Sequence, residues 1–213
     1  MNDTLLWSEK AQTLFSESGF QFDPWQWQWQ AQQTTLTDDA RPIDALSALQ
    51  QLRPQLRKVP IAVIGPREAS SEEYECAEQL GKALAEAGLQ LICGGKNGVM
   101  EAAAKGHLQA GGSPIGLIPE TEWTQANPYI SIPIATGIGK SRNVIIAQAC
   151  PVLIAVGGGY GTMSEMAFGL HFEKQILTLG NAPVLPGTIA CDNVADAIAQ
   201  TANYLLRHET DHN

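Results

Sequence analysis

The pattern of apolar and polar positions divides the chain near Val59-Pro60. Beyond this point, short apolar runs alternate with segments whose apolar residues recur at helical spacing. Before it, the sequence is rich in glutamine and follows no such alternation. We therefore expect an N-terminal extension over residues 1–58 and an α/β domain over residues 59–213.

The second region predicts a Rossmann-like fold. Strands are expected at 61–64, 89–93, 114–118, 130–134, 152–156 and 175–179, and helices at 70–87, 99–110, 143–150, 161–172 and 194–206. Ser70 and Glu73 have the spacing of a capping box, and Gly88 is placed to end the same helix. This alternation predicts a parallel sheet flanked by helices on both faces, with the glycine-rich turns at the carboxyl ends of its strands.

The extension is expected to be helical and extended. Residues 4–16 carry apolar side chains at helical spacing, and a second helix is expected from Pro42 to Leu52. Between them, residues 19–30 alternate aromatic and polar side chains, which predicts a half-buried strand or an extended arm. Its tryptophans are a possible base-stacking platform. We favour an arm packed on the main domain or on a second subunit, because no basic residues interleave them.

Composition and charge narrow the range of partners. A net charge of −9 without clustered Lys and Arg argues against binding to long nucleic acid. Backbone amides can still bind a small anion whatever the net charge. The four cysteines lack CxxC spacing, which favours reduced thiols in a cytoplasmic protein. The first 15 residues lack the continuous apolar stretch of a signal peptide, and no apolar run is long enough for a membrane span.

The strongest chemical signal is the glycine-rich loop between the strand at 152–156 and the following helix. It comprises Gly157, Gly158, Gly159, Tyr160, Gly161 and Thr162. Glycines allow the backbone to approach a ligand closely, and the helix N-terminus offers unpaired N–H groups and a partial positive charge. We therefore expect this loop to hold a phosphate group, with the Thr162 hydroxyl as a further donor.

Two further turns are candidate walls of the same pocket. Gly94, Gly95 and Gly98 lie in one of them, again between a strand and a helix. The other contains Arg142, whose guanidinium is suited to phosphate or carboxylate, although a surface arginine is an equally good reading of the spacing. The Gly-Lys-Ser at 139–141 is not a Walker A motif, and the loop after the first strand is not a dinucleotide fingerprint.

Glu165 has two readings. Thr162 and Glu165 have capping-box spacing, so the carboxylate can serve the helix end. A carboxylate one turn from a phosphate site can also face the sugar of a nucleotide and stabilise an oxocarbenium-like transition state. Other catalytic signals are weak: the histidines show no metal-ligand spacing and a Gly-x-Ser-x-Gly elbow is missing, so we expect no metal site.

Residues 59–206 resemble the LOG-like superfamily, long mislabelled as lysine decarboxylases. Its PGGxGTxxE motif is matched by Gly158, Gly159, Gly161, Thr162 and Glu165. A second family segment is matched by the glycines of the turn at 94–98 together with Met100, and the family arginine by Arg142. In the enzymes of this family the arginine and the glutamate are catalytic, and they cleave nucleoside 5′-monophosphates to free base and ribose 5-phosphate.

Two departures from the enzyme pattern favour a different branch. Gly157 replaces the family proline, and Asn143 follows the arginine where the enzymes commonly have lysine. Both departures resemble the molybdenum cofactor carrier proteins and their uncharacterised bacterial relatives. Those carriers resemble the enzymes in fold and hold a phosphorylated pterin, so the resemblance implies molybdenum cofactor as a possible bound ligand and no cofactor that the chain requires.

Three hypotheses follow. The first is a carrier that binds a phosphorylated pterin or a nucleotide at residues 157–162. The second is a phosphoribohydrolase, in which Glu165 stabilises the ribosyl cation and Arg142 orients the substrate. The third is a nucleotide sensor with the N-terminal arm as its output. We rank the first slightly above the second and the third well behind. By its resemblance to the family, the chain is also expected to form a homo-oligomer, a dimer or a tetramer.

Overall fold

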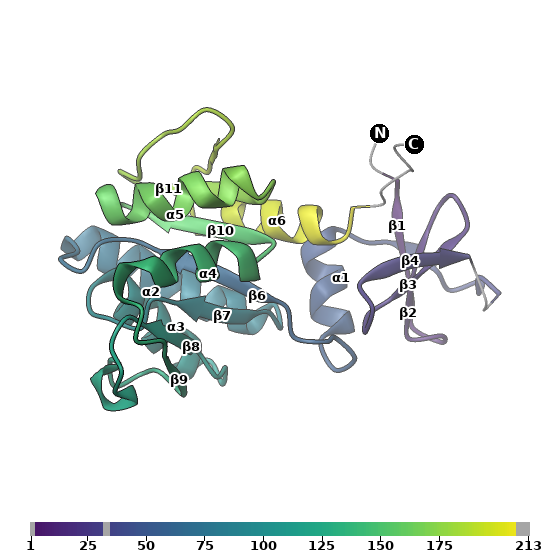
Figure 1. Cartoon of the computed structure of the whole chain (residues 1–213). Coiled ribbons are helices and arrows are strands. Elements are labelled where there is room, and N and C mark those ends of the chain that lie inside the picture. The colour runs from purple at the N-terminus through teal and green to yellow at the C-terminus, as the bar shows by residue number, and fades with distance from the viewer. Residues whose placement is uncertain (1–2, 32–34, 208–213) are drawn as a thin grey trace. The chain divides into compact units, whose positions relative to one another are not determined.

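The computed structural model describes residues 3–31 and 35–207. The chain forms two compact units (Figure 1). One consists of Val59–Ile198, and the other combines Met1–Lys58 with Ala199–Asn213. Because the boundary at residue 198 falls inside the last helix, that helix contributes to both units.

The larger unit is built on a seven-stranded sheet with the order β12-β11-β10-β6-β7-β8-β9, in which every neighbouring pair is parallel. Its strands contain no charged residue, as expected for strands covered on both faces. They are β6 (Pro60–Ile64), β7 (Gln90–Cys93), β8 (Ile115–Ile118), β9 (Ile132–Ala135), β10 (Val152–Val156), β11 (Gln175–Leu179) and β12 (Ile189–Ala190).

Helices follow most of these strands. They are α2 (Ser71–Glu86), α3 (Val99–Gln109), α4 (Arg142–Ala149), α5 (Tyr160–His171) and α6 (Val194–Leu205), with short 3-10 turns η1 (Trp123–Gln125) and η2 (Gly139–Ser141). The capping box at Ser70 and Glu73 is present, and Gly88 follows α2 with a positive φ of 80°. Helix α2 therefore begins and ends where its sequence predicts.

Two pairs of helices cover opposite faces of the sheet (Figure 1). Helices α4 and α5 pack on the face formed by Ala62, Ile92 and Leu153, and they contribute Ile146 and Met166 to that buried core. Helices α2 and α3 pack against each other on the other face. The predicted Rossmann-like parallel sheet with flanking helices is thus confirmed. The two-residue edge strand β12 and the 3-10 turns η1 and η2 were not expected from the sequence.

The smaller unit contains an antiparallel sheet with the order β4-β3-β2-β1-β5. Its elements are β1 (Leu5–Ser8), β2 (Thr13–Ser16), β3 (Phe20–Asp23), β4 (Gln28–Ala31), β5 (Arg41–Pro42) and helix α1 (Ala45–Leu52). Helix α1 begins after Asp44, whose carboxylate accepts a hydrogen bond from the Ser47 amide at 2.9 Å. The expected helix of this region therefore starts a few residues after Pro42.

The helix expected over residues 4–16 is wrong, because this segment is the β1–β2 hairpin. Trp7 and Leu14 are seven residues apart, which places them on one side of a helix, but here they face each other across the two strands. Gln12 adopts a positive φ of 50° in the turn that reverses the chain. Strands of four residues are too short to display a period of two, so the spacing of their apolar residues imitated a helix.

The tryptophan-rich segment is a second hairpin formed by β3 and β4. Phe22 faces Trp29 across the strands, and their ring centroids are 5.2 Å apart. Trp27 lies in the connecting turn with a positive φ of 57°, and its indole donates a hydrogen bond to the Arg57 carbonyl. The expected extended conformation is therefore correct for the two strands but interrupted by a turn. Of the three tryptophans, Trp25 alone is largely exposed.

Two further observations concern the whole described part of the chain. All four cysteines are free thiols, and three of them are buried. Across residues 3–31 and 35–207, none of the helices has both the length and the apolar character that a membrane crossing requires.

Candidate functional site

The candidate site lies where the strand order of the parallel sheet reverses. From β6 the chain passes through α2 to β7 on one side, and from β10 it passes through α5 to β11 on the other. The two loops diverge at the carboxyl ends of neighbouring strands, and ligands of open α/β sheets bind in the crevice that such a divergence creates. The loop after β7 reaches the same place, because the Val99 amide donates a hydrogen bond to the Pro66 carbonyl at 3.1 Å.

The glycine loop leads directly into α5. Gly157 and Gly158 have positive φ values of 58° and 135°, and Gly159 is the N-cap residue. A Cβ on Gly158 would lie 2.6 Å from the Thr162 side chain, so the loop folds tightly over the first turn of its helix. Within the described residues, this N-terminus receives no hydrogen bond from a capping side chain, which leaves its amides free to bind an anion.

Three helix N-termini at this edge differ in how they are capped. Helix α3 begins after Gly98, which, like Gly159, offers no capping side chain. Helix α2 is closed by its capping box, and the Glu73 carboxylate of that box lies against Gly157, where a Cβ would collide with it. The α3 N-terminus is instead covered by the loop after β6, because the Val99 amide donates to the Pro66 carbonyl and a Cβ on Gly98 would collide with the carbonyls of Pro66 and Arg67. Of these three N-termini, that of α5 is therefore the one open to a ligand.

Behind the glycine loop, Arg142 and Glu165 form a buried ion pair. The Arg142 Nη1 donates to the Glu165 Oε1 at 3.1 Å, and each side chain is only 8% exposed. The Arg142 Nη2 donates to the Gly94 carbonyl at 3.4 Å, whereas its Nε is buried without a hydrogen-bond partner in the described structure. The arginine is therefore not an ordinary surface residue but joins α4, α5 and the turn after β7.

The turn after β7 passes close to the Arg142 guanidinium and has glycine at the point of contact. A Cβ on Gly94 would collide with the Arg142 guanidinium and would lie 2.7 Å from the Met100 Sδ. Gly95 makes a similarly close approach to Ile118 on the neighbouring strand, at a positive φ of 66°. Gly94 therefore lies directly against Arg142, with the Met100 sulfur beside it, whereas Gly95 packs on β8.

Asn143 ties the arginine to the glycine loop, a role that sequence reasoning missed. Its Oδ1 accepts a hydrogen bond from Arg142, and its Nδ2 donates to the Ser164 Oγ at 3.0 Å and to the Gly161 carbonyl at 3.4 Å. The Ser164 hydroxyl also donates to Gly161 at 2.6 Å. The sequence marked Asn143 only as a departure from the enzyme pattern. The sequence signal for this role was its side-chain amide, which can accept a hydrogen bond at its oxygen and donate hydrogen bonds from its nitrogen.

Burial changes the protonation of the site. It raises the pKa of Glu165 to about 7, although the neighbouring Arg142 guanidinium opposes the rise. Burial likewise raises the pKa of the nearby Cys93 thiol to about 11. Glu165 is thus the group of this cluster whose charge changes near neutral pH.

The capping-box reading of Thr162 and Glu165 is wrong. The N-cap of α5 is Gly159, three residues before Thr162, and the Glu165 carboxylate pairs with Arg142. The wrong reading arose because both residues fit the spacing of a cap, while the true N-cap has no side chain. The Thr162 hydroxyl lies in the first turn and is almost fully buried.

Basic residues gather at this edge of an acidic protein. Between Val59 and Ile198, four of the seven lysines and arginines follow the carboxyl ends of strands: Arg67, Lys96, Lys140 and Arg142. Lys96 pairs with Glu120 at 3.0 Å and donates to the Gln125 carbonyl. Two of these four basic residues thus lie beside carboxylates of the same edge, Lys96 beside Glu120 and Arg142 beside Glu165.

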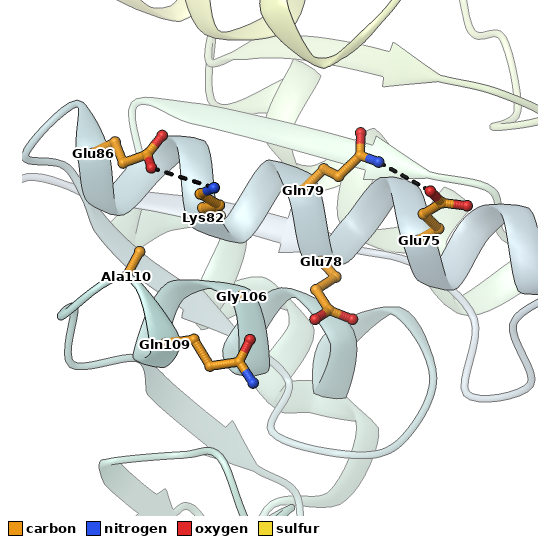
Figure 2. A pocket seen from close by; sticks show the side chains of 8 residues that line it. All are labelled: Glu75, Glu78, Gln79, Lys82, Glu86, Gly106, Gln109 and Ala110. Carbon is orange, nitrogen blue, oxygen red and sulfur yellow. Dashed lines mark hydrogen bonds and ion pairs between the residues drawn. The ribbon is translucent and has the colours of Figure 1, made fainter.

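A groove of about 670 Å³ lies elsewhere, between α2 and α3 (Figure 2). Its α2 wall carries the Lys82–Glu86 ion pair and the Gln79–Glu75 hydrogen bond. On α3 it is lined by Gly106, Gln109 and Ala110, at the end of that helix remote from its N-terminus. None of the candidate residues lies in this groove.

The comparisons with known proteins agree with the resemblance expected from the motifs. The model of the SLOG cluster4 family matches residues 58–210. The chain therefore belongs to this family, and its expected placement in the LOG-like superfamily is confirmed. Residues 1–57 lie outside the matched region.

Two solved structures and one relative at the sequence level are informative. The molybdenum cofactor carrier protein of Chlamydomonas reinhardtii is 34% identical, with a TM-score of 0.66, covering 71% of this chain and all of that one. The molybdenum cofactor binding protein of Rippkaea orientalis is 32% identical, with a TM-score of 0.65, covering 68% of this chain and 96% of that one. The cytokinin riboside 5′-monophosphate phosphoribohydrolase of Rhodococcoides fascians is 30% identical over 160 residues, covering 66% of this chain and 77% of the enzyme.

Proposed function

We propose that this chain is a carrier for a phosphorylated small molecule, with a pterin of the molybdenum cofactor type as the first candidate and a nucleotide as the second. The observation that carries the proposal is the uncapped N-terminus of α5, which follows three glycines and lies beside a buried arginine. The likeness to two molybdenum cofactor binding proteins supports the carrier role.

The phosphate group occupies the glycine loop. The amides at the start of α5 donate hydrogen bonds to its oxygens, and the Thr162 hydroxyl supplies one more. Arg142 contributes positive charge from behind the loop, where burial strengthens its effect. Its guanidinium is held in place by Glu165, Asn143 and the Gly94 carbonyl, so little rearrangement accompanies binding. The proposal of a pterin ligand is therefore supported by the site for its phosphate group.

The position of Glu165 favours a carrier over a hydrolase. A glutamate that stabilises a ribosyl cation must present its carboxylate to the sugar. In this chain the carboxylate is 8% exposed and accepts a hydrogen bond from Arg142. The arginine therefore competes with a substrate for the same oxygen atoms.

A phosphoribohydrolase is the second candidate, supported by the 30% identical relative. In that reaction the bond between the base and C1′ of ribose breaks, water adds to C1′, and the base leaves with a proton. Glu165 would stabilise the cation at C1′ and Arg142 would orient the substrate. Arg142 and Glu165 are paired in this structure. A substrate whose phosphate draws Arg142 away from this pair therefore frees the Glu165 carboxylate to face the sugar.

Two measurements separate these functions. The first is mass spectrometry of small molecules released from the purified protein, with the Gly159→Asp variant as the matched control. A phosphorylated pterin or nucleotide that is retained by the unchanged protein and lost from the variant is the expected result. A protein that carries no such ligand, and binds neither inorganic phosphate nor any nucleoside 5′-monophosphate, contradicts the proposal.

The second measurement is incubation with a panel of nucleoside 5′-monophosphates, with free base followed by chromatography. We expect no release of base. Release that disappears in the Glu165→Gln variant would instead establish the hydrolase, and the released base would identify its substrate.

A further inference from the structure

Two segments of the smaller unit contain no acidic residue. Residues 24–31, which form the β3–β4 turn and strand β4, carry no charge at all. Residues 45–58, which form α1 and the segment after it, carry three charges, and all three are positive: Arg53, Arg57 and Lys58. In a chain with 22 acidic and 13 basic residues, this segment is a local excess of positive charge.

The fold holds these two segments against each other. The Arg57 amide donates a hydrogen bond to the Pro24 carbonyl at 3.1 Å, and the Trp27 indole donates one to the Arg57 carbonyl at 2.8 Å. The Arg57 guanidinium carbon lies 5.8 Å from the centre of the Trp25 ring, where a cation is attracted to the face of an indole. The tryptophans thus gain the basic neighbours that their own segment lacks. We call this group the aromatic-basic patch: Trp25, Arg53, Arg57 and Lys58.

Trp25 presents its ring to solvent from a turn that hydrogen bonds hold in place. Its side chain is 59% exposed, whereas Trp27 and Trp29 are half-buried. The Asp23 carboxylate accepts hydrogen bonds from the Trp25 and Gln26 amides at 2.8 and 2.9 Å, and the Trp27 amide donates to the Asp23 carbonyl. A flat ring that stacks on such an indole restricts little further motion, because the side chain has only two rotatable bonds.

The positive charge of the patch has few counter-charges. Arg53 and Arg57 are exposed, and neither forms an ion pair with another described residue. Partial burial and the charge of Arg53 lower the pKa of Lys58, so two cations lie close enough to repel each other. In the adjoining turn, both oxygens of Asp23 already accept hydrogen bonds, one of them from the Gln30 side chain at 3.0 Å. An anionic ligand is therefore favoured at the patch.

An open aromatic ring beside positive charge is typical of sites for single-stranded nucleic acid. Bases of any sequence stack on such rings, and Arg and Lys side chains bind the phosphates between them. Sites for free small molecules are concave, whereas the tryptophan and both arginines of the patch are exposed. A short flexible strand contacts the patch alone, while a long or rigid nucleic acid also meets the acidic surface of a chain with a net charge of −9.

We propose that the aromatic-basic patch binds short single-stranded nucleic acid, with one base stacked on Trp25 and the neighbouring phosphates paired with Arg53, Arg57 and Lys58. The tryptophan and the two arginines precede residues 58–210, which the family model matches. The patch is also separate from the glycine loop, which belongs to the larger unit. The proposal is therefore independent of the proposed carrier function.

Stacking is tested with a fluorescent oligothymidylate of about 12 nucleotides and the full-length protein, by fluorescence anisotropy. We expect a Kd of about 1–100 µM at about 50 mM salt. Trp25→Ala should weaken binding about fivefold or more, and Trp25→Phe, which keeps a ring, should stay within about twofold. Trp123→Ala is the matched control, because it removes a tryptophan of the larger unit that is 63% exposed, and we expect it to leave the affinity unchanged.

The phosphate contacts are tested by the dependence of binding on salt. For single strands the slope of log K against log salt is about −0.7 for each phosphate that is bound, so three contacts predict a slope of about −2. Arg53→Gln and Arg57→Gln should each reduce this slope by about 0.7. Arg41→Gln is the control, because Arg41 is an exposed residue of β5, at the opposite edge of the sheet from β4, and its slope should be unchanged.

Several outcomes overturn the proposal. It fails if the oligonucleotide does not bind, if Trp25→Ala loses no more affinity than Trp123→Ala, or if a duplex of the same sequence binds as tightly as the single strand. Oligonucleotide binding that is lost in Gly159→Asp would place the strand at the glycine loop instead.

Two further probes separate the strand from other anions. AMP or polyglutamate that binds as tightly as the oligonucleotide, with a loss in Trp25→Ala, would overturn the proposal in favour of a free nucleotide or an acidic peptide. We expect neither, because AMP brings a single phosphate and polyglutamate has no base to stack. Circular dichroism verifies that each variant is folded.

Discussion

Gly159 is the position at which the phosphate site can be tested most sharply. Its φ of −136° is accessible to any residue, and a Cβ built there has no atom within 4 Å. A side chain therefore fits without strain, and replacing glycine at such a position stabilises the folded state by about 0.4–1 kcal/mol. Because Gly159 is the N-cap of α5, aspartate there also accepts hydrogen bonds from the first-turn amides.

The Gly159→Asp variant is thus expected to fold more stably and to bind less. Two unit charges 4 Å apart near a protein surface repel each other by about 4 kcal/mol. Even half of this energy weakens the binding of a phosphate group by about thirtyfold. The carboxylate also occupies the amides that the phosphate needs. A loss of affinity without a loss of stability distinguishes this site from a turn that requires glycine only for packing.

Two further variants separate the possible causes. Gly159→Ala adds a Cβ alone, and we expect its affinity to stay within about threefold of the unchanged protein, because nothing opposes the methyl group. Gly159→Asn caps the helix without a charge, so its affinity should lie between those of the other two. Binding of inorganic phosphate and nucleoside 5′-monophosphates is measured by calorimetry, and stability by thermal unfolding. Undiminished affinity in Gly159→Asp would refute the phosphate site.

Three other predictions concern the site and the helix that borders it. Between the ordinary pKa of 4.5 and the raised value of about 7, the folded state binds a proton at Glu165 that the unfolded chain has lost, so stability should fall as pH rises through this range. Denaturation of the Glu165→Gln variant at pH 4.5 to 8 should lack this part of the fall, and identical pH profiles would contradict the raised pKa. Gly94→Ala should weaken phosphate binding at least tenfold, because its Cβ collides with the Arg142 guanidinium, and calorimetry that shows unchanged affinity would argue against a role for Arg142. Ser70→Ala should lower the free energy of unfolding by about 1 kcal/mol through loss of the α2 cap, as measured by urea denaturation, whereas Ser71→Ala, one residue later, should change it little.

Much of the larger unit could be predicted from the sequence because its signals are local. Buried parallel strands such as Val152–Val156 are continuous apolar runs, and helix boundaries such as Ser70 and Gly88 depend on neighbouring residues alone. The glycine loop was identified for the same reason, since its residues are consecutive. The antiparallel unit was harder, because Trp7 and Leu14 meet only after the chain reverses between them.

The sequence by itself determined the parallel α/β architecture, the position of the glycine loop and the acidic net charge. Tertiary structure decided the rest. Arg142 and Glu165 are 23 residues apart, and only the packing of α4 on α5 brings their charges together and buries them. The same packing joins Asn143 to the glycine loop. Such properties depend on distance and burial, which spacing along the chain does not encode for residues on different elements.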